Sequence, residues 1–185
     1  MIRVLSRRYP LTSTAYKYLE IGINVGPPSY VEIAIGDNRG NELIMSLETW
    51  KGLYEQRWNV LTPPQTDYKA RSQADSCNFI STGPLTARIC TIKNGLFIRL
   101  ESQNICMIMN KSTLCRMLDL DDCVDAMFDR LVKFIDIVDV QFTRFSNIAS
   151  TVTNPDQVPN AIRTSDVFDK YRLVDCELLA LAFSM

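Results

Sequence analysis

The feature that most constrains the fold of this chain is a pattern of alternating apolar and polar residues that leads into a capped helix and then occurs a second time. In its first copy, the alternation predicts strands over residues 16–23, 30–35 and 42–45. Asp37-Asn38-Arg39-Gly40 between the last two strands is a favourable hairpin turn, because Asn and Gly accept left-handed backbone angles. Ser46 then caps a helix whose apolar positions recur at helical spacing: Leu47, Trp50, Leu53, Tyr54 and Trp58.

The second copy follows a polar, proline-containing stretch over residues 62–76, which we interpret as a long connection. Strands are predicted over residues 86–93 and 96–101, on either side of the strong hairpin signal Asn94-Gly95. A further strand over residues 104–109 leads to Asn110, which caps a short helix with Leu114, Met117 and Leu118 on one side.

The two copies also align with each other in sequence. Residues 44–50, Ile-Met-Ser-Leu-Glu-Thr-Trp, lie over residues 108–114, Ile-Met-Asn-Lys-Ser-Thr-Leu, so that strand end, cap and first buried helical position coincide. The sequence therefore predicts an α+β fold built on a duplicated antiparallel β-sheet-plus-helix unit, with copies at about residues 14–60 and 77–118. We expect one domain over residues 1–145 to contain both copies.

The last third of the chain is predicted to begin with a helical region. An apolar stripe over residues 121–145 indicates one long amphipathic helix, or two helices with a break. Residues 146–165 have the prolines and polar residues of a flexible linker. The apolar segment 166–185 is expected to dock on its own domain, on a sister subunit or on a protein partner.

Composition argues against most enzyme classes. The chain contains no histidine, and it has no phosphate-binding glycine loop or nucleophile elbow, so we expect no enzyme activity, no cofactor and no metal. No apolar run is long enough to span a membrane, and the start of the chain is too polar for a signal peptide. The six scattered cysteines are expected to be buried thiols in a reducing compartment, which predicts an intracellular protein, nuclear or cytoplasmic.

Charge is divided unevenly along the chain. Residues 1–118 carry 14 Lys and Arg against 9 Asp and Glu, a balance of +5, whereas residues 119–185 carry 6 against 12, a balance of −6. An acidic helical surface beside an ordinary one would account for this division. A basic sheet that binds an anion, with an acidic tail that competes for it, is the sharper interpretation.

The order of elements resembles that of the Whirly proteins, and each copy resembles the single unit of the transcriptional coactivator positive cofactor four. The segments that carry the resemblance are residues 33–37 with 42–50, and 88–99 with 109–118, within a similar stretch of about residues 14–140. The Whirly lysine-glycine-lysine motif is absent, and Tyr16-Lys17-Tyr18 stands near its place. The resemblance implies curved antiparallel sheets that bind single-stranded nucleic acid.

Single-strand binding needs aromatic rings for base stacking and cations for phosphates on one exposed face. A two-residue loop at Asn94-Gly95 predicts that Arg88 lies opposite Glu101, Cys90 opposite Arg99, and Ile92 opposite Phe97. The candidate nucleic-acid-binding residues are Tyr16, Lys17, Tyr18, Arg39, Arg88, Lys93, Phe97 and Arg99.

These residues and the resemblance together predict a sequence-tolerant binder of single-stranded DNA or RNA that acts in transcription, replication or genome maintenance, as a homo-oligomer. The alternative is a protein–protein interaction or viral structural module that binds no nucleic acid, with a protein partner held by the C-terminal segment. A carboxylate and metal enzyme based on Asp119, Asp121, Asp122 and Asp125 is a third hypothesis, but this spacing suits a helix start better.

Overall fold

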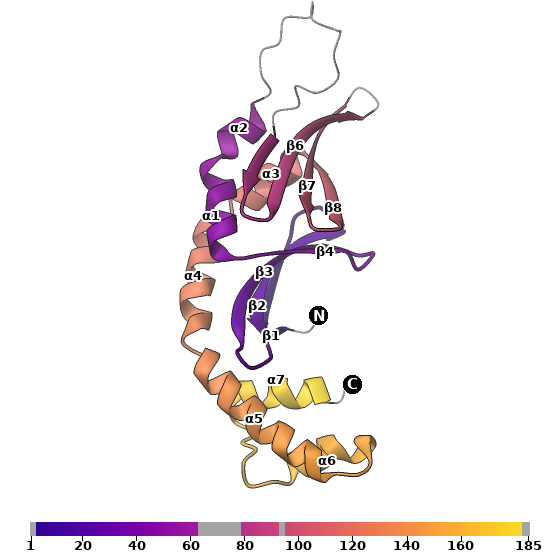
Figure 1. Ribbon diagram of the computed structural model, residues 1–185, viewed down its shortest axis with the longest axis vertical. Helices are drawn as coiled ribbons and strands as arrows, with labels where there is room; N and C mark the ends of the chain where they lie inside the picture. The colour runs from indigo at the N-terminus through magenta and orange to yellow at the C-terminus, as the bar shows by residue number, and fades with distance from the viewer. Residues whose placement is uncertain (1–2, 63–78, 93–94, 183–185) are drawn as a thin grey trace, which may run out of the picture. The chain divides into compact units, whose positions relative to one another are not determined.

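A computed structural model describes residues 3–62, 79–92 and 95–182, and within these ranges the chain forms two four-stranded antiparallel sheets and seven α-helices (Figure 1). The predicted α+β class and the duplicated sheet-plus-helix arrangement are thus confirmed. The predicted connection over residues 62–76 lies almost wholly outside the described residues, as does Lys93.

The first sheet has the strand order β1-β2-β3-β4 and is followed by the helices α1 and α2. Its strands and helices span Arg3–Pro10, Lys17–Asn24, Tyr30–Asp37, Glu42–Met45, Leu47–Glu55 and Arg57–Leu61. The strand β1 has no counterpart in the sequence-based prediction. The turn between β3 and β4 is the predicted one, and Gly40 there has a φ of 85°, which a residue with a side chain rarely adopts.

The second sheet has the strand order β5-β6-β7-β8 and is followed by α3. These elements span Phe79–Thr82, Leu85–Ile92, Gly95–Ser102, Ile105–Asn110 and Lys111–Leu118. One face of this sheet is buried, as predicted: Ala87, Ile98 and Leu100 are at most 2% exposed.

Both sheet-to-helix junctions use the predicted caps. The Ser46 hydroxyl accepts a hydrogen bond from the Thr49 backbone N–H at 3.2 Å, and the Asn110 side chain accepts one from the Thr113 N–H at 2.8 Å. The next residue in each helix, Trp50 or Leu114, is fully buried. The aligned segments of the two copies therefore occupy the same structural positions.

The C-terminal third is helical throughout most of its length. The apolar stripe forms two helices, α4 and α5, and the chain continues through the short helices η1 and α6 to α7. These span Asp121–Val132, Ile135–Thr151, Pro155–Gln157, Val158–Arg163 and Leu173–Ala182.

The expectation of a flexible linker over residues 146–165 is therefore wrong. Residues up to Thr151 extend α5, and Pro155 and Pro159 occupy the first turns of η1 and α6. Proline is favoured there because the missing N–H would be unsatisfied in any case. In the last segment, α7 packs on α5 and α6.

The described residues divide into two compact units whose boundaries differ from the expected domain boundaries. The sheet unit comprises Arg8–Glu20 and Glu32–Ala126, and the helical unit comprises Met1–Arg7, Ile21–Val31 and Met127–Met185. Within the sheet unit, β4 of the first sheet packs on β7 and β8, α1 on β5, and α3 on β7 and β8. All described candidate binding residues belong to the sheet unit.

None of the five described cysteines is fully buried, so the expectation of buried thiols is wrong for these five. Cys106 and Cys123 are exposed free thiols on β8 and α4, and Cys90, Cys115 and Cys176 are half-buried. In the part of the chain described by the structure, no helix has the length and hydropathy needed to cross a membrane.

Candidate nucleic-acid interface

The outer face of the second sheet brings three of the candidate residues together. The β6–β7 register places Arg88 directly opposite Arg99 and Cys90 opposite Phe97. Because side chains on neighbouring strands alternate with period two, all four residues point to one face of the sheet. Both arginines are exposed and Phe97 is half-buried, so the face displays two guanidinium groups next to an aromatic ring.

The predicted register of this hairpin is wrong by two residues. Gly95 pairs with Ile92 and belongs to β7, so the strands are joined by residues 93 and 94, which the structure does not describe. A shift of two residues keeps every side chain on its predicted face. It replaces the predicted pairing of Arg88 with Glu101 by a pairing of two arginines.

Glu101 lies one pair further along the same face and forms ion pairs with both arginines. Its carboxylate forms an ion pair with Arg99, and its Oε2 lies 3.7 Å from the Arg88 Nε. Like charges that face each other across strands are unfavourable, so this carboxylate offsets a repulsion that the register creates. The pKa of Arg99 lies above its ordinary value, because Cys106 and Glu101 both favour its charged form.

The same face also carries apolar side chains. Ile108 on β8 pairs with Arg99 and is 37% exposed, and Ile92 on β6 is 39% exposed. A hollow of about 410 Å³ lies beside Arg99 and Glu101 at the turn between β7 and β8. We call the surface formed by Arg88, Ile92, Phe97, Arg99 and Ile108 the arginine face.

A second, smaller group of candidate residues lies at one end of the first sheet. The Tyr16 carbonyl accepts a hydrogen bond from the Asn38 N–H at 3.0 Å, which ties it to the turn that carries Arg39. The Lys17 Nζ lies 5.2 Å from the centre of the Tyr16 ring. Burial lowers the pKa of Lys17, Asp37 raises it and Arg39 lowers it, with a net value below the ordinary one. Tyr16, Lys17 and Arg39 are thus neighbours, and Arg39 is exposed.

Tyr18 does not offer the open ring that the sequence suggested. It is only 5% exposed, and the Arg8 guanidinium lies 3.8 Å from the centre of its ring. A Cβ atom added to Gly36 would come within 2.2 Å of the Tyr18 Cζ, so the ring also lies against the backbone of β3. The expectation that a base stacks on Tyr18 is therefore wrong for this arrangement.

Polar contacts fix Tyr18 further. Its hydroxyl donates to the Glu42 Oε1 at 3.0 Å, and burial followed by this hydrogen bond raises the pKa of the phenol. Arg8 donates to the Glu20 Oε2 from Nε and from Nη2, at 3.1 and 2.8 Å. Sequence analysis missed this cluster, because the arginine comes from β1, a strand that the alternation did not reveal.

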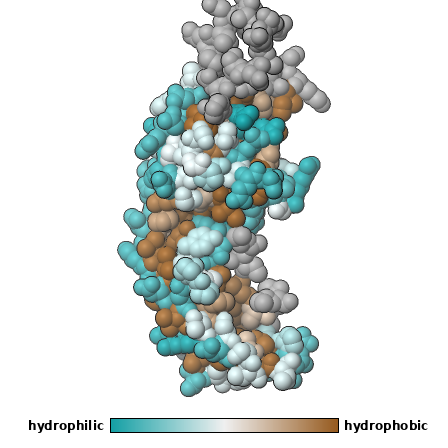
Figure 2. All heavy atoms as spheres, in the orientation of Figure 1, coloured by the Kyte–Doolittle hydropathy of each residue, from teal (hydrophilic) through white to brown (hydrophobic). Residues whose placement is uncertain are grey.

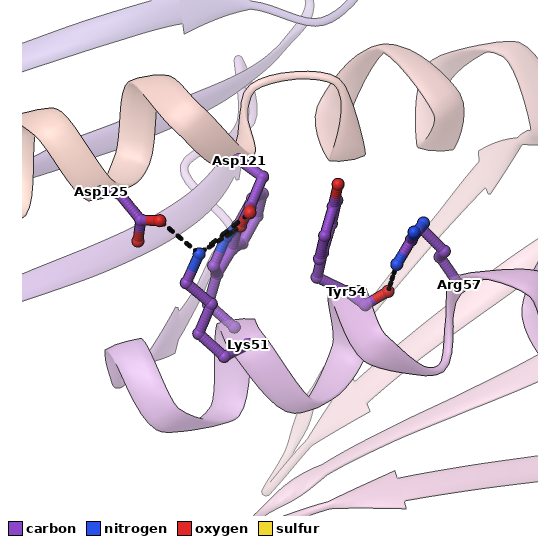
Figure 3. A network of polar contacts seen from close by, with 6 residues as sticks. Lys51, Tyr54, Arg57, Asp121 and Asp125 are labelled. Atoms are coloured by element: carbon purple, nitrogen blue, oxygen red, sulfur yellow. Dashed lines mark hydrogen bonds and ion pairs between the residues drawn. The ribbon is translucent and has the colours of Figure 1, made fainter.

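Two of the aspartates considered for a metal site bind side chains of α1 instead. Asp121 accepts hydrogen bonds from the Trp50 Nε1 at 2.7 Å and from the Lys51 Nζ at 2.9 Å, and Asp125 accepts from the same Nζ at 2.6 Å (Figure 3). Burial lowers the pKa of Lys51, but its hydrogen bonds to Asp125 and Asp121 outweigh burial and raise the pKa above its ordinary value. Two of the four aspartates therefore join α1 to the start of α4. Among residues 3–62, 79–92 and 95–182, no group of three or more Cys, Asp and Glu side chains is suited to hold a metal ion.

Fold and candidate interface together define an α+β protein with two four-stranded antiparallel sheets, each followed by a capped helix. No protein-family model matches the chain, and no curated protein matches its sequence at a significant level.

Proposed function

We propose that the chain binds single-stranded nucleic acid on the arginine face, without strong dependence on base sequence. The observation that carries this proposal is the pairing of Arg88 with Arg99 beside Phe97 on one exposed sheet face. Guanidinium groups from two paired positions on neighbouring strands can hold phosphate oxygens, and the neighbouring ring offers a stacking surface to a base.

In this mechanism, phosphates displace the Glu101 carboxylate from the arginines. Tyr16, Lys17 and Arg39 form an additional contact point on the first sheet, and Lys93 is proposed as a further phosphate contact. Binding releases counterions, so the affinity should fall steeply as salt concentration rises. The proposal includes a role in transcription, replication or genome maintenance and a nuclear or cytoplasmic location. It agrees with the resemblance to Whirly proteins and to positive cofactor four.

The proposal is tested by fluorescence anisotropy of a labelled oligothymidine, as DNA and as the matching uridine RNA, at two salt concentrations. The double variant Arg88→Ala/Arg99→Ala should weaken binding by about ten- to a hundredfold and reduce the salt dependence, because two phosphate contacts are lost. The double variant Lys111→Ala/Arg116→Ala removes the same charge from exposed positions on α3 and should change the affinity only slightly. Equal losses in both double variants, or no binding at low salt, would count against the proposal.

A second candidate function is self-association or protein binding through the arginine face. It is favoured by the exposed side chains of Ile92 and Ile108 and by the ion pairs of Glu101 with both arginines, since mixed apolar and paired polar surfaces are typical of protein interfaces. An Ile108→Lys variant distinguishes the two functions. If the face joins two copies, the variant should lower the mass measured by light scattering, whereas a nucleic-acid surface should keep or gain affinity for the oligonucleotide.

A further inference from the structure

The helical unit contains a groove that the nucleic-acid proposal does not use. It has a volume of about 870 Å³, and it is lined by residues of β1, by the end of α4 and by α5 and α7. A groove of this size is comparable to known ligand sites in proteins. Apolar side chains, drawn in brown, also reach the surface over the helices of this unit (Figure 2).

Exposed apolar side chains form part of the groove lining. Ile137 and Val140 on α5 are 46% and 52% exposed, and Leu173 at the start of α7 is 64% exposed. On α5 the fully buried Val138 belongs to a different face of the helix. The helix therefore has one apolar face that is buried in the unit and a second apolar face that the described elements leave exposed.

Arginines surround this apolar surface. Arg7, Arg130, Arg144 and Arg172 line the groove, and among the described residues two acidic ones, Asp136 and Glu177, line it with them. Residues 119–185 have a net charge of −6, yet three of their six basic residues are gathered here. The groove is thus positively charged within an acidic part of the chain.

One of the two acidic lining residues already binds a backbone group of this unit. The Glu177 Oε2 accepts a hydrogen bond from the Leu5 backbone N–H at 2.8 Å. Among the arginines, Arg172 lies 3.9 Å from Asp169, a solvent-exposed pair that contributes little. An acidic group that enters the groove therefore meets an excess of positive charge.

We propose that this groove binds an acidic amphipathic helix of a partner protein. The apolar face of such a helix would cover Ile137, Val140 and Leu173, and its carboxylates would pair with the surrounding arginines. An added strand is the less suitable occupant, although β1 is an edge strand of its sheet. The reason is that Glu177 already binds the Leu5 N–H and that Leu5 has a φ of 54°, which interrupts the regular edge.

The probe for this proposal is a fluorescein-labelled peptide with leucines at helical spacing and glutamates at the positions between them. It is titrated with the full chain in an anisotropy experiment. A peptide of the same composition with scrambled order and a peptide with lysine in place of glutamate are the controls. We expect saturable binding of the first peptide alone, because only it presents an apolar face together with negative charge.

Two matched valine variants locate the contact. Val140→Glu places a carboxylate on the groove surface and should weaken peptide binding by about tenfold or more. Val132→Glu makes the same change on α4 at a valine that is 44% exposed and does not line the groove, so it should leave the affinity nearly unchanged. Both positions are exposed, and thermal unfolding of each variant verifies that it folds.

The following results would overturn the proposal: no binding of the amphipathic acidic peptide, equal binding of the scrambled or lysine peptide, or equal effects of the two variants. A concentration-dependent dimer that Val140→Glu dissociates and the peptide does not would assign the groove to a second copy of the chain instead. This proposal rests on residues of the helical unit, so oligonucleotide binding and peptide binding can each fail without the other.

Discussion

Arg88 and Arg99 lie directly opposite each other on β6 and β7, and one carboxylate, that of Glu101, forms ion pairs with both. In the proposed mechanism this carboxylate competes with phosphate for the two guanidinium groups. Glu101→Gln should therefore increase the affinity for single-stranded oligonucleotides by about three- to tenfold, because the competitor is removed and the shape of the side chain is kept. Anisotropy titrations at constant salt measure this change. Glu48→Gln on α1 is the control for the altered net charge, and an equal increase there would show that the position of Glu101 is irrelevant.

Asp121 and Asp125 bind the same lysine but should contribute unequally to stability. Asp121→Ala leaves the indole N–H of the fully buried Trp50 without its acceptor, which costs about 2–4 kcal/mol in free energy of unfolding. Asp125→Ala removes a partner whose side chain is 45% exposed, and its cost should stay below about 1 kcal/mol. Urea denaturation measures both variants, and equal midpoints would contradict the assigned role of Asp121.

Gly36 should not tolerate a side chain. The ring of Tyr18 lies where a Cβ atom would stand, and this ring is covered by Arg8 and fixed by its hydrogen bond to Glu42. Gly36→Ala should therefore lower the free energy of unfolding by about 1–3 kcal/mol or more, since neither the ring nor the backbone can move away easily. Gly26→Ala is the control, because nothing lies within 4 Å of a Cβ atom there. Similar unfolding midpoints for the two variants would show that the ring can move aside.

Asp37 should make the sheet unit sensitive to acid. Burial raises the pKa of this carboxyl, but hydrogen bonds from the Asn41 side chain and from the backbone N–H groups of Asn41 and Arg39 together outweigh burial and leave the pKa below its ordinary value. Because the pKa of Asp37 is depressed in the folded state, its ionised carboxylate stabilises the fold fully above the unfolded-state pKa of about 4. This stabilisation is lost as the pH falls through the lower folded-state pKa. Denaturant titrations from neutral pH down to about pH 2 should show this loss. Asp37→Asn should reduce the slope of stability against pH in that range, and an unchanged slope would assign the acid sensitivity to other groups.

Local signals in the sequence were sufficient for the class of fold and for the starts of α1 and α3. Ser46 and Asn110 each accept a hydrogen bond from a backbone N–H three residues later, so the information for the cap lies within four consecutive residues. The alternation over β6 and β7 likewise predicted which side chains face the core, because the period of two depends only on the strand itself. For the same reason Arg88, Phe97 and Arg99 could be placed on one face before their partners were known.

The contacts of these residues were decided by tertiary structure. Gly95 joined β7, so the register moved by two residues and Arg88 came to face Arg99 in place of Glu101. Tyr18 became buried because β1, which no local pattern revealed, brought Arg8 over its ring. Asp121 accepts a hydrogen bond from Trp50, 71 positions earlier in the chain, and this contact joins α1 to the start of α4. The sequence by itself thus determined the fold class, the caps of α1 and α3 and the faces of β6 and β7, since these depend on neighbouring residues. The edge strands β1 and β5, the register, burial and the long-range partners depend on the packing of segments that are distant in the chain.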